Sequence, residues 1–226
     1  MGGFLLSTPY DVIWLEKKPI LAKEVALLLH RIGAIRFGNF ILSSGRESPY
    51  YIDLRILPSY PEILKRVVEL YVEMINNEIR SKEEIHRIAG IPTAGLPIAT
   101  LVSQLIPLPL LYVRKQEKKY GLEKIVEGVI KAGDRVVVVD DVVTTGHSAL
   151  EQIRVLREHG GIVNHLVVLI DRDEGGESNL AKENVTLHYL MKIGDLFTYL
   201  KNLNLVDQEK YDEVMKYVMK YRKGGS

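Results

Sequence analysis

The chain has 226 residues, of which 46% are hydrophobic and 26% are charged, and its formal net charge is +1. This length suits one large domain with a substantial core, and the composition is typical of a globular protein. The balanced charge excludes a uniformly basic nucleic-acid-binding protein. Without cysteine the chain forms no disulfide and uses no thiol in catalysis; without a signal peptide or a long apolar run it is expected to be cytoplasmic.

The first predicted elements are helices over residues 22–32 and 61–77, with a segment between them that we expect to be irregular. After them, short runs rich in Val, Ile and Leu alternate with stretches of helical period. These patterns predict buried strands at residues 87–90, 110–113, 136–139 and 166–170, and helices at 96–104 and 148–158. Residues 207–221 have the spacing of an amphipathic helix.

The alternation of strands and helices predicts an α/β fold in which helices cover both faces of a parallel sheet. Ligands of such folds bind beyond the carboxyl ends of the strands. The chain contains no internal repeat, low-complexity tract or clear linker, so we expect residues 1–226 to form a single domain.

The most informative motif is VVVVDDVVTTGHS at residues 136–148, where a β-branched strand ends in two adjacent carboxylates. The loop after them offers hydroxyls, a glycine and the N–H groups of a helix start, which together suit a phosphate. Because carboxylates repel a phosphate, Asp140 and Asp141 are expected to bind the neutral hydroxyls of a ribose instead. The structural alternative is an Asp-rich turn followed by a Ser/Thr helix cap. The whole motif favours a sugar-phosphate site.

At this motif the chain resembles the type I phosphoribosyltransferases, whose fingerprint is a hydrophobic run, two acids and a Thr/Gly-rich loop. Three further segments resemble the orotate phosphoribosyltransferases: FGNFILSSGRESPYYIDLR at residues 37–55, YVRKQEKKYG at 112–121 and LIDRDEGG at 169–176. The resemblance implies a five-stranded parallel sheet flanked by helices. It also implies a small hood over roughly residues 1–60, a core over roughly 61–200 and a homodimer.

The resemblance further implies the reaction, in which phosphoribosyl pyrophosphate and orotate give orotidine 5′-monophosphate and pyrophosphate during de novo UMP synthesis. The metal of the family is Mg²⁺, which keeps much of its water and binds substrate phosphates. We therefore expect the substrate pyrophosphate to carry the ion. None of the six histidines has metal-ligand spacing, and no residue is assigned to a metal.

By resemblance, the catalytic residues are Lys118, Asp140 and Asp141. The residues expected to bind phosphoribosyl pyrophosphate are Thr93, Ala94, Arg114, Lys115, Lys118, Tyr120, Asp140, Asp141, Val142, Val143, Thr144, Thr145, Gly146, His147 and Ser148. Those expected to bind orotate are Tyr51, Ile52, Thr144 and Arg172, with the guanidinium of Arg172 pairing the orotate carboxylate. The loop that carries Lys118 is expected to close over the partner subunit's active site and exclude water.

Simpler interpretations exist for two of these segments. The basic run at residues 114–119 alone fits a solvated turn, and Arg172 alone fits a surface ion pair with Asp171 or Asp173. The chain also departs from many bacterial members, which have lysines where Ser43 and Ala94 stand here. Arg46 is a candidate replacement for the charge missing at Ser43.

Two other functions compete with this interpretation. A nucleotide-sensing transcription regulator needs a DNA-binding module, and the segment before Phe37 is short for a helix-turn-helix domain and lacks an evident recognition helix. A purine salvage phosphoribosyltransferase is expected to lack the segment SGRESPYYIDLR, which this chain contains.

Overall fold

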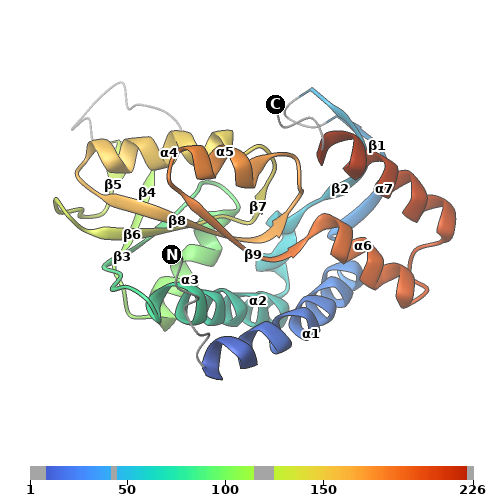
Figure 1. The fold of residues 1–226 in the computed structure, drawn as a ribbon, viewed down its shortest axis with the longest axis horizontal. Helices are drawn as coiled ribbons and strands as arrows, with labels where there is room; N and C mark the ends of the chain where they lie inside the picture. Colours follow the sequence, from blue (N-terminus) through green and yellow to red (C-terminus); the bar gives the residue numbers. More distant parts are fainter. Residues whose placement is uncertain (1–8, 42–44, 115–124, 223–226) are drawn as a thin grey trace, which may run out of the picture.

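The computed structural model describes residues 9–41, 45–114 and 125–222. At its centre lies a sheet with helices on both faces, and an antiparallel hairpin stands at one end of this sheet (Figure 1). Five strands of the sheet have four residues or more and are mutually parallel. In spatial order they are β4 (Leu110–Val113), β3 (Arg87–Gly90), β6 (Arg135–Val139), β8 (Ile162–Asp171) and β9 (Thr186–Lys192). The predicted parallel sheet is confirmed.

Two strands of two residues each extend this sheet. Strand β5 (Val126–Glu127) pairs antiparallel with β4, and β7 (Val142–Val143) pairs parallel with the last residues of β8. After β6 ends, the fingerprint motif pairs briefly with β8 through β7. It therefore stays in the sheet for two more residues before the loop begins.

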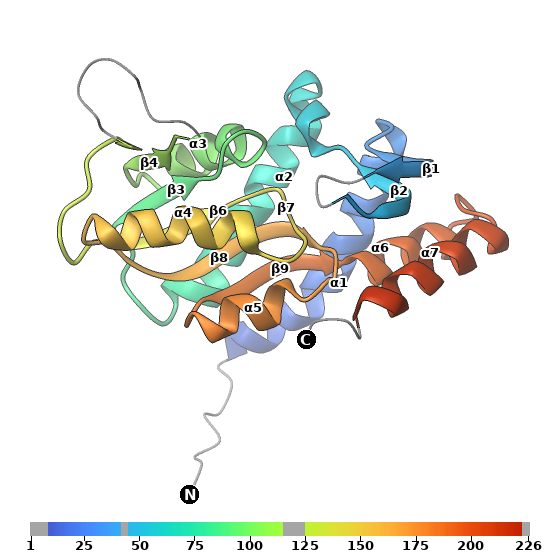
Figure 2. The ribbon, with the colours of Figure 1, turned by 90° about the horizontal axis from the view of Figure 1, so that it is seen from above.

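Alternating side chains of β6 enter two separate cores. Val137 and Val139 pack with α1 (Pro9–Arg31), α2 (Pro61–Met74) and α3 (Gly95–Leu105), whereas Val136 and Val138 pack with α4 (His147–Glu158) and α5 (Gly176–Lys182). Figures 1 and 2 show these two helical layers on opposite faces. Burial of both faces explains why the strand is an unbroken apolar run.

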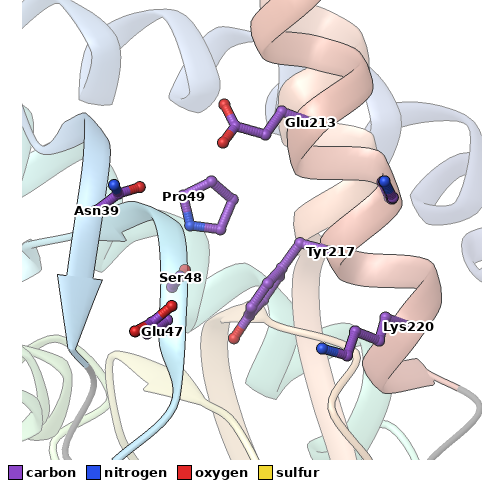
Figure 3. A pocket seen from close by; sticks show the side chains of 8 residues that line it. Asn39, Glu47, Ser48, Pro49, Glu213, Tyr217 and Lys220 are labelled. Carbon is purple, nitrogen blue, oxygen red and sulfur yellow. The ribbon is translucent and has the colours of Figure 1, made fainter.

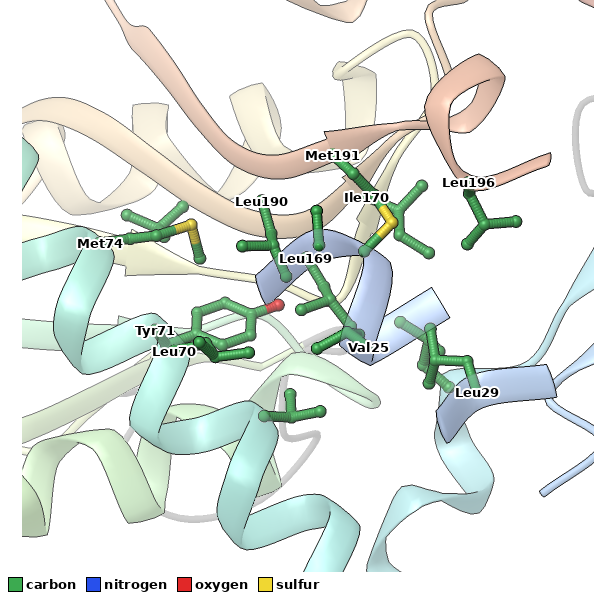
Figure 4. Packing of buried hydrophobic residues seen from close by; sticks show 14 of the residues in the cluster. Val25, Leu29, Leu70, Tyr71, Met74, Leu169, Ile170, Leu190, Met191 and Leu196 are labelled. Carbon is green, nitrogen blue, oxygen red and sulfur yellow. The ribbon is translucent and has the colours of Figure 1, made fainter. Parts of the chain in front are cut away.

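The larger core joins helices and strands that are distant in the sequence. Figure 4 shows Leu70, Tyr71 and Met74 of α2 in one cluster with Leu169 of β8 and Leu190 of β9. Further members in the same view come from α1, β8, β9 and α6 (Ile193–Asn202): Val25, Leu29, Ile170, Met191 and Leu196. Strand β9 and α6 were not among the predicted elements.

The segment expected to be irregular is mostly regular, so that prediction was wrong. It forms β1 (Ile35–Ile41) and β2 (Glu47–Ile52), paired as a hairpin, followed by the 3₁₀ helix η1 (Leu54–Ser59). The hairpin strands are largely exposed on one face, so they lack the apolar runs that mark the buried strands of the sheet. Helix α7 (Gln208–Arg222) packs beside β2, with Tyr217 against Tyr50.

Two predicted helix boundaries were also wrong. Helix α1 begins at Pro9 rather than at residue 22 and contains Pro19, a residue that usually ends a helix. Helix α2 ends at Met74 and continues as the π-helical segment η2 (Ile75–Arg80). Within the described parts of the chain, no helix combines the length and apolarity that crossing a membrane requires.

Candidate active site at the carboxyl edge of the sheet

The strand register brings the predicted segments to one edge. Gly90, the last residue of β3, is paired with Tyr112 of β4 and with Val139, the last residue of β6. Because these strands are parallel, the residues that follow them emerge at the same edge. The segments that follow these strands, beginning at Thr93, Arg114 and Asp140, therefore emerge at this one edge.

Backbone hydrogen bonds fix the acidic pair at the end of β6. The N–H of Asp140 donates to Val167 O at 3.0 Å, and the hydroxyl of Tyr71 donates to Asp140 O at 2.7 Å. The N–H of Asp141 donates to Asp140 Oδ1 at 2.9 Å, while Asp141 O accepts from Leu169 N at 3.0 Å. Burial raises the pKa of the Asp141 carboxyl, so a hydrogen-bond donor or a cation at this position would favour its charged form.

The loop after the acidic pair leads into α4 and is held by a hydrogen bond from α5. Gly146 adopts a left-handed conformation with φ 76° and begins α4 without a side chain that caps the first-turn N–H groups. The side-chain amide of Asn179 donates to Thr145 O at 3.0 Å. His147 and Ser148 are exposed. The N–H groups at the start of α4 are thus suited to an anion.

The turn that contains Thr93 and Ala94 closes against the acidic pair. A Cβ atom on Gly95 would lie 2.8 Å from Asp140 Cα and from Val139 O, so the start of α3 approaches β6 this closely only with glycine. Beside this turn is a small, mostly apolar hollow. Its lining residues are Leu54, Arg55, Leu57, Pro58, Leu64, Thr93, Ala94, Pro97 and Ile98.

Arg172 is buried, with 5% of the residue exposed. Its Nε lies 2.8 Å from Glu174 Oε1, and its Cζ lies 4.7 Å from the ring centroid of Tyr50. The backbone N–H of Arg172 donates to Val143 O at 2.9 Å, and this hydrogen bond joins Arg172 to β7. The alternative of a surface ion pair with Asp171 or Asp173 was wrong, because the partner is the equally buried Glu174.

Glu174 also engages the arginine proposed as a substitute cation. Arg46 Nη1 lies 3.3 Å from Glu174 Oε2, and Arg46 Cζ lies 4.8 Å from the ring centroid of Tyr221. Its guanidinium is therefore part of the contact between the hairpin and the Arg172 segment. Ser43, whose missing charge it was expected to replace, lies outside the described residues.

The two hairpin residues expected to contact orotate end β2. The ring of Tyr51 packs against Phe40 with centroids 5.5 Å apart, and its hydroxyl accepts a hydrogen bond from Arg55 Nη2 at 3.1 Å. Ile52 is paired with Ile35 of β1. Both residues are partly exposed.

The predicted basic loop is only partly described. Arg114 forms an ion pair with Glu127 across β4 and β5. Lys115, Lys118 and Tyr120 lie outside the described residues. No group of three or more His, Asp or Glu side chains in the described ranges is arranged to hold a metal ion.

A separate open groove lies between the hairpin and α7 (Figure 3). Its lining residues are Asn39, Glu47, Ser48, Pro49, Glu213, Lys216, Tyr217 and Lys220. It meets the candidate site at Ser48, whose Oγ lies 3.4 Å from Arg172 Nη2, and at Tyr217, which packs against Tyr50. Because its charged side chains are mixed in sign and none of the predicted site residues lines it, we do not assign it to the reaction.

The sequence interpretation missed three residues that shape this edge. Arg55 and Glu174 stand inside quoted segments, and their partners Tyr51 and Arg172 are near them in the sequence, but these residue types alone do not indicate the contacts. Tyr71 gave no signal, because an aromatic residue on the apolar face of a helix is an ordinary core residue.

The chain is similar to known proteins over most of its length. The model of the phosphoribosyl transferase domain matches residues 57–189. The orotate phosphoribosyltransferase of Methanocaldococcus jannaschii is 47% identical over 169 residues, which cover 75% of this chain and 93% of that protein. Among solved structures, orotate phosphoribosyltransferase from Aeropyrum pernix has a TM-score of 0.70 and 37% identity, covering 81% of this chain and 99% of that one.

The UMP synthase of Leishmania donovani has a TM-score of 0.78 and 35% identity over 88% of this chain, which spans 42% of the length of that one. The matched domain, the parallel sheet and the acidic strand end define a phosphoribosyltransferase. Within that class, the chain belongs to the orotate phosphoribosyltransferase family. The family predicted from the sequence is confirmed.

Proposed function

We propose that this protein transfers the phosphoribosyl group of phosphoribosyl pyrophosphate to orotate, releasing pyrophosphate and forming orotidine 5′-monophosphate. One observation carries the proposal beyond family membership. The hydrogen bond from Arg172 N to Val143 O, 2.9 Å long, ties the segment suited to a carboxylate to the segment suited to a sugar phosphate. A phosphorylated ribose held by one segment would thus lie next to an acidic base held by the other.

The phosphoribosyl group is assigned to the fingerprint motif. The N–H groups and hydroxyls from Thr144 to Ser148 bind its 5′-phosphate, since an uncapped helix start favours an anion. Asp140 and Asp141 accept hydrogen bonds from the ribose hydroxyls. The Thr93–Ala94 turn and Arg114 face the pyrophosphate, which gathers negative charge as it departs.

Orotate is assigned to Arg172, Thr144 and the end of β2. A guanidinium pairs a carboxylate through two parallel hydrogen bonds, and Glu174 orients the guanidinium of Arg172 from its Nε side. The backbones of Tyr51 and Ile52 would bind the amide-like edge of the ring. These roles rest on the resemblance and on the placement of the residues at one edge.

Mg²⁺ is the ion that we propose for this reaction. It commonly takes one or two carboxylates together with the phosphate oxygens of a substrate, and needs no cage made of protein alone. Asp140 and Asp141 offer suitable oxygen atoms, and a cation near Asp141 would offset the cost of burying its charge. The residues therefore fit an ion carried mainly by the pyrophosphate, whose charge it neutralises.

We also propose a homodimer in which Lys115, Lys118 and Tyr120 act on the substrate of the neighbouring subunit. A closed loop would exclude water from the oxocarbenium-like carbon and prevent hydrolysis. The cytoplasmic location and the division into a hood over roughly 1–60 and a core over roughly 61–200 stay predictions from the sequence.

The assignment of orotate is tested with Arg172→Lys. Lysine keeps a positive charge beside the buried Glu174 but lacks the planar fork that pairs a carboxylate. We expect the KM for orotate to rise about 10-fold or more while the KM for phosphoribosyl pyrophosphate changes little. The control is Arg154→Lys, at an arginine paired with Glu183. A folded Arg172→Lys variant with the wild-type KM for orotate would remove Arg172 from the orotate site.

A further inference from the structure

Arg55 stands between the two parts of the candidate site. It lies in the first turn of η1, directly after the hairpin, and lines the hollow beside the turn of Thr93 and Ala94. Its side chain is 59% exposed. The residue therefore borders both the end of β2, assigned to orotate, and the turn at the start of α3, assigned to pyrophosphate.

Two neighbours fix the direction of the Arg55 guanidinium. Its Nε donates to Asp53 Oδ1 at 2.7 Å and its Nη2 donates to the hydroxyl of Tyr51 at 3.1 Å. These bonds use two of its five N–H donors and leave three without a partner within the described part of the chain. Asp53 is 9% exposed, so the accessible end of this ion pair is its positive one.

The edge of the sheet needs a further positive charge if it is to bind a pyrophosphate. Two arginines of the site are already paired, Arg114 with Glu127 and Arg172 with Glu174. The turn of Thr93 and Ala94 has no charge of its own. Asp53 raises the pKa of Arg55 most and Asp141 adds to this shift, which agrees with the place of Arg55 in the hollow beside the Thr93–Ala94 turn. A pyrophosphate entering that space gains most from a cation whose direction is already set.

We propose that Arg55 binds the pyrophosphate group of phosphoribosyl pyrophosphate from the hairpin side and supplies the positive charge that the Thr93–Ala94 turn lacks. The inference deepens the proposed function and rests on it. Because Tyr51 and Asp53 hold the guanidinium, both belong to the arrangement as positioning residues.

The test compares Arg55→Met and Arg55→Lys with wild type, using binding of pyrophosphate with Mg²⁺ and steady-state kinetics. A contact to a charged group is typically worth about 10- to 100-fold in affinity, so Arg55→Met should weaken pyrophosphate binding and raise the KM for phosphoribosyl pyrophosphate by that factor. Arg55→Lys should recover part of the loss. The KM for orotate should change by less than about threefold, since that ligand keeps its contacts.

The matched control is Arg154→Met. Arg154 lies on α4, is 53% exposed and makes one ion pair, 2.7 Å long, with Glu183. It reproduces the loss of an exposed, paired arginine away from the edge. Neither pyrophosphate binding nor either KM should change in this variant, and urea unfolding of every variant checks that the proteins compared are folded.

The possible results separate this inference from the proposed function. Unchanged pyrophosphate binding in Arg55→Met, or a rise confined to the KM for orotate, overturns the role of Arg55 while orotate transfer by wild type stands. Conversely, wild type that fails to transfer phosphoribosyl to orotate contradicts the proposed function. The binding measurement then still decides about Arg55, because it needs no turnover.

Discussion

Backbone hydrogen bonds hold Asp140 and Asp141 at the end of β6. Their main-chain groups are bonded to β8 and to Tyr71. Replacing either side chain by an amide leaves those bonds intact. We expect Asp140→Asn and Asp141→Asn to lower kcat/KM for phosphoribosyl pyrophosphate about 100-fold with little change in the free energy of unfolding. Enzyme kinetics and urea unfolding measure the two effects.

A carboxylate at the opposite edge provides the control. Asp134 precedes β6, and its Oδ2 accepts hydrogen bonds from Arg87 Nε at 2.7 Å and Lys131 N at 2.8 Å. Asp134→Asn should lower the free energy of unfolding by about 1–3 kcal/mol and leave the activity per folded molecule unchanged. If Asp140→Asn behaves like Asp134→Asn, its carboxylate is structural.

Gly95 is a second residue on which the geometry depends. A methyl group there would lie 2.8 Å from Asp140 Cα, so α3 must shift away from β6. We expect Gly95→Ala to destabilise the fold by about 1–3 kcal/mol and to reduce activity as well. In Gly194→Ala, on α6, the new atom would meet Met215 Cε at an ordinary 3.6 Å, and stability should be unchanged or improved. Equal stabilities of the two variants would contradict the close approach.

Individual site residues were predictable to different degrees. Asp140 and the loop after it could be placed from the sequence because strand, acids and helix start are neighbours in the chain. The pairing of Arg172 with Glu174 was not foreseen, although only one residue separates them, because burial of the pair depends on the hairpin folding over it. The placement of Arg55 beside Thr93 joins segments almost 40 residues apart.

At the level of elements, a partly buried network of polar side chains links β8 and β9 to η2. His165 Nδ1 and His188 Nε2 are 3.0 Å apart, and His188 Nδ1 lies 2.7 Å from Glu78 Oε2. His165 Nε2 lies 2.7 Å from Glu83 Oε1. Glu78 Oε1 also accepts hydrogen bonds from α1, which come from Trp14 Nε1 and Lys18 Nζ.

The pKa values of two members of this network, Glu78 and His165, predict how the stability of the protein depends on pH. Burial alone would raise the pKa of Glu78, but hydrogen bonds from His188, Lys18 and Trp14 lower it to about 2. Burial lowers the pKa of His165, against the opposing effect of Glu83, while nearby Lys82 lowers it further. In both cases the unfolded chain binds protons at a higher pH than the folded one. Stability should therefore fall as the pH drops below about 6.5, and fall further below about 4.5.

The variant that tests this dependence is Glu78→Gln. It should lower the free energy of unfolding at pH 7 by at most about 3 kcal/mol and flatten the loss of stability below pH 4.5. Glu84→Gln is the control, since the Glu84 side chain is 77% exposed. Denaturant unfolding from pH 7.5 to about pH 2 measures both, since the folded and unfolded pKa values of Glu78 bound that range. An unaltered slope in Glu78→Gln would show that another group controls acid stability.

Elements buried on both faces were the easiest to predict. Strands β3 and β4 have the predicted bounds, because an apolar run bounded by polar residues leaves little freedom of register. The hairpin escaped notice because its strands contain Gly38 and polar residues and cover only one side. Helix α1 extends further toward the amino terminus than the predicted helix and runs through Pro19, a residue that usually ends a helix.

For the whole molecule, the decisive prediction concerns the dimer. We expect Lys118→Ala and Asp140→Asn subunits, each nearly inactive alone, to regain activity when mixed, because one site of a mixed dimer contains both defects and the other neither. Random exchange at equal amounts should restore about a quarter of the wild-type activity. No recovery despite demonstrated subunit exchange would place Lys118 in the site of its own subunit.

The parallel sheet, its ligand edge and the family could be predicted from the sequence, since each follows from runs of adjacent residues. The position of the hairpin over the Arg172 segment could not, because contacts such as Arg46 with Glu174 join residues that are distant in the chain. In the proposed function, specificity for the acceptor base depends on that second kind of contact. It is therefore the property that most needs a direct measurement.

That measurement is pyrophosphate release from phosphoribosyl pyrophosphate and Mg²⁺ with orotate, hypoxanthine or adenine supplied separately to the purified protein. In the proposed function the guanidinium of Arg172 pairs with a carboxylate on the acceptor, and orotate is the one acceptor of the three that has it. The account predicts rapid release with orotate, accompanied by orotidine 5′-monophosphate, and release at the acceptor-free rate with either purine. Release with a purine and none with orotate would contradict it.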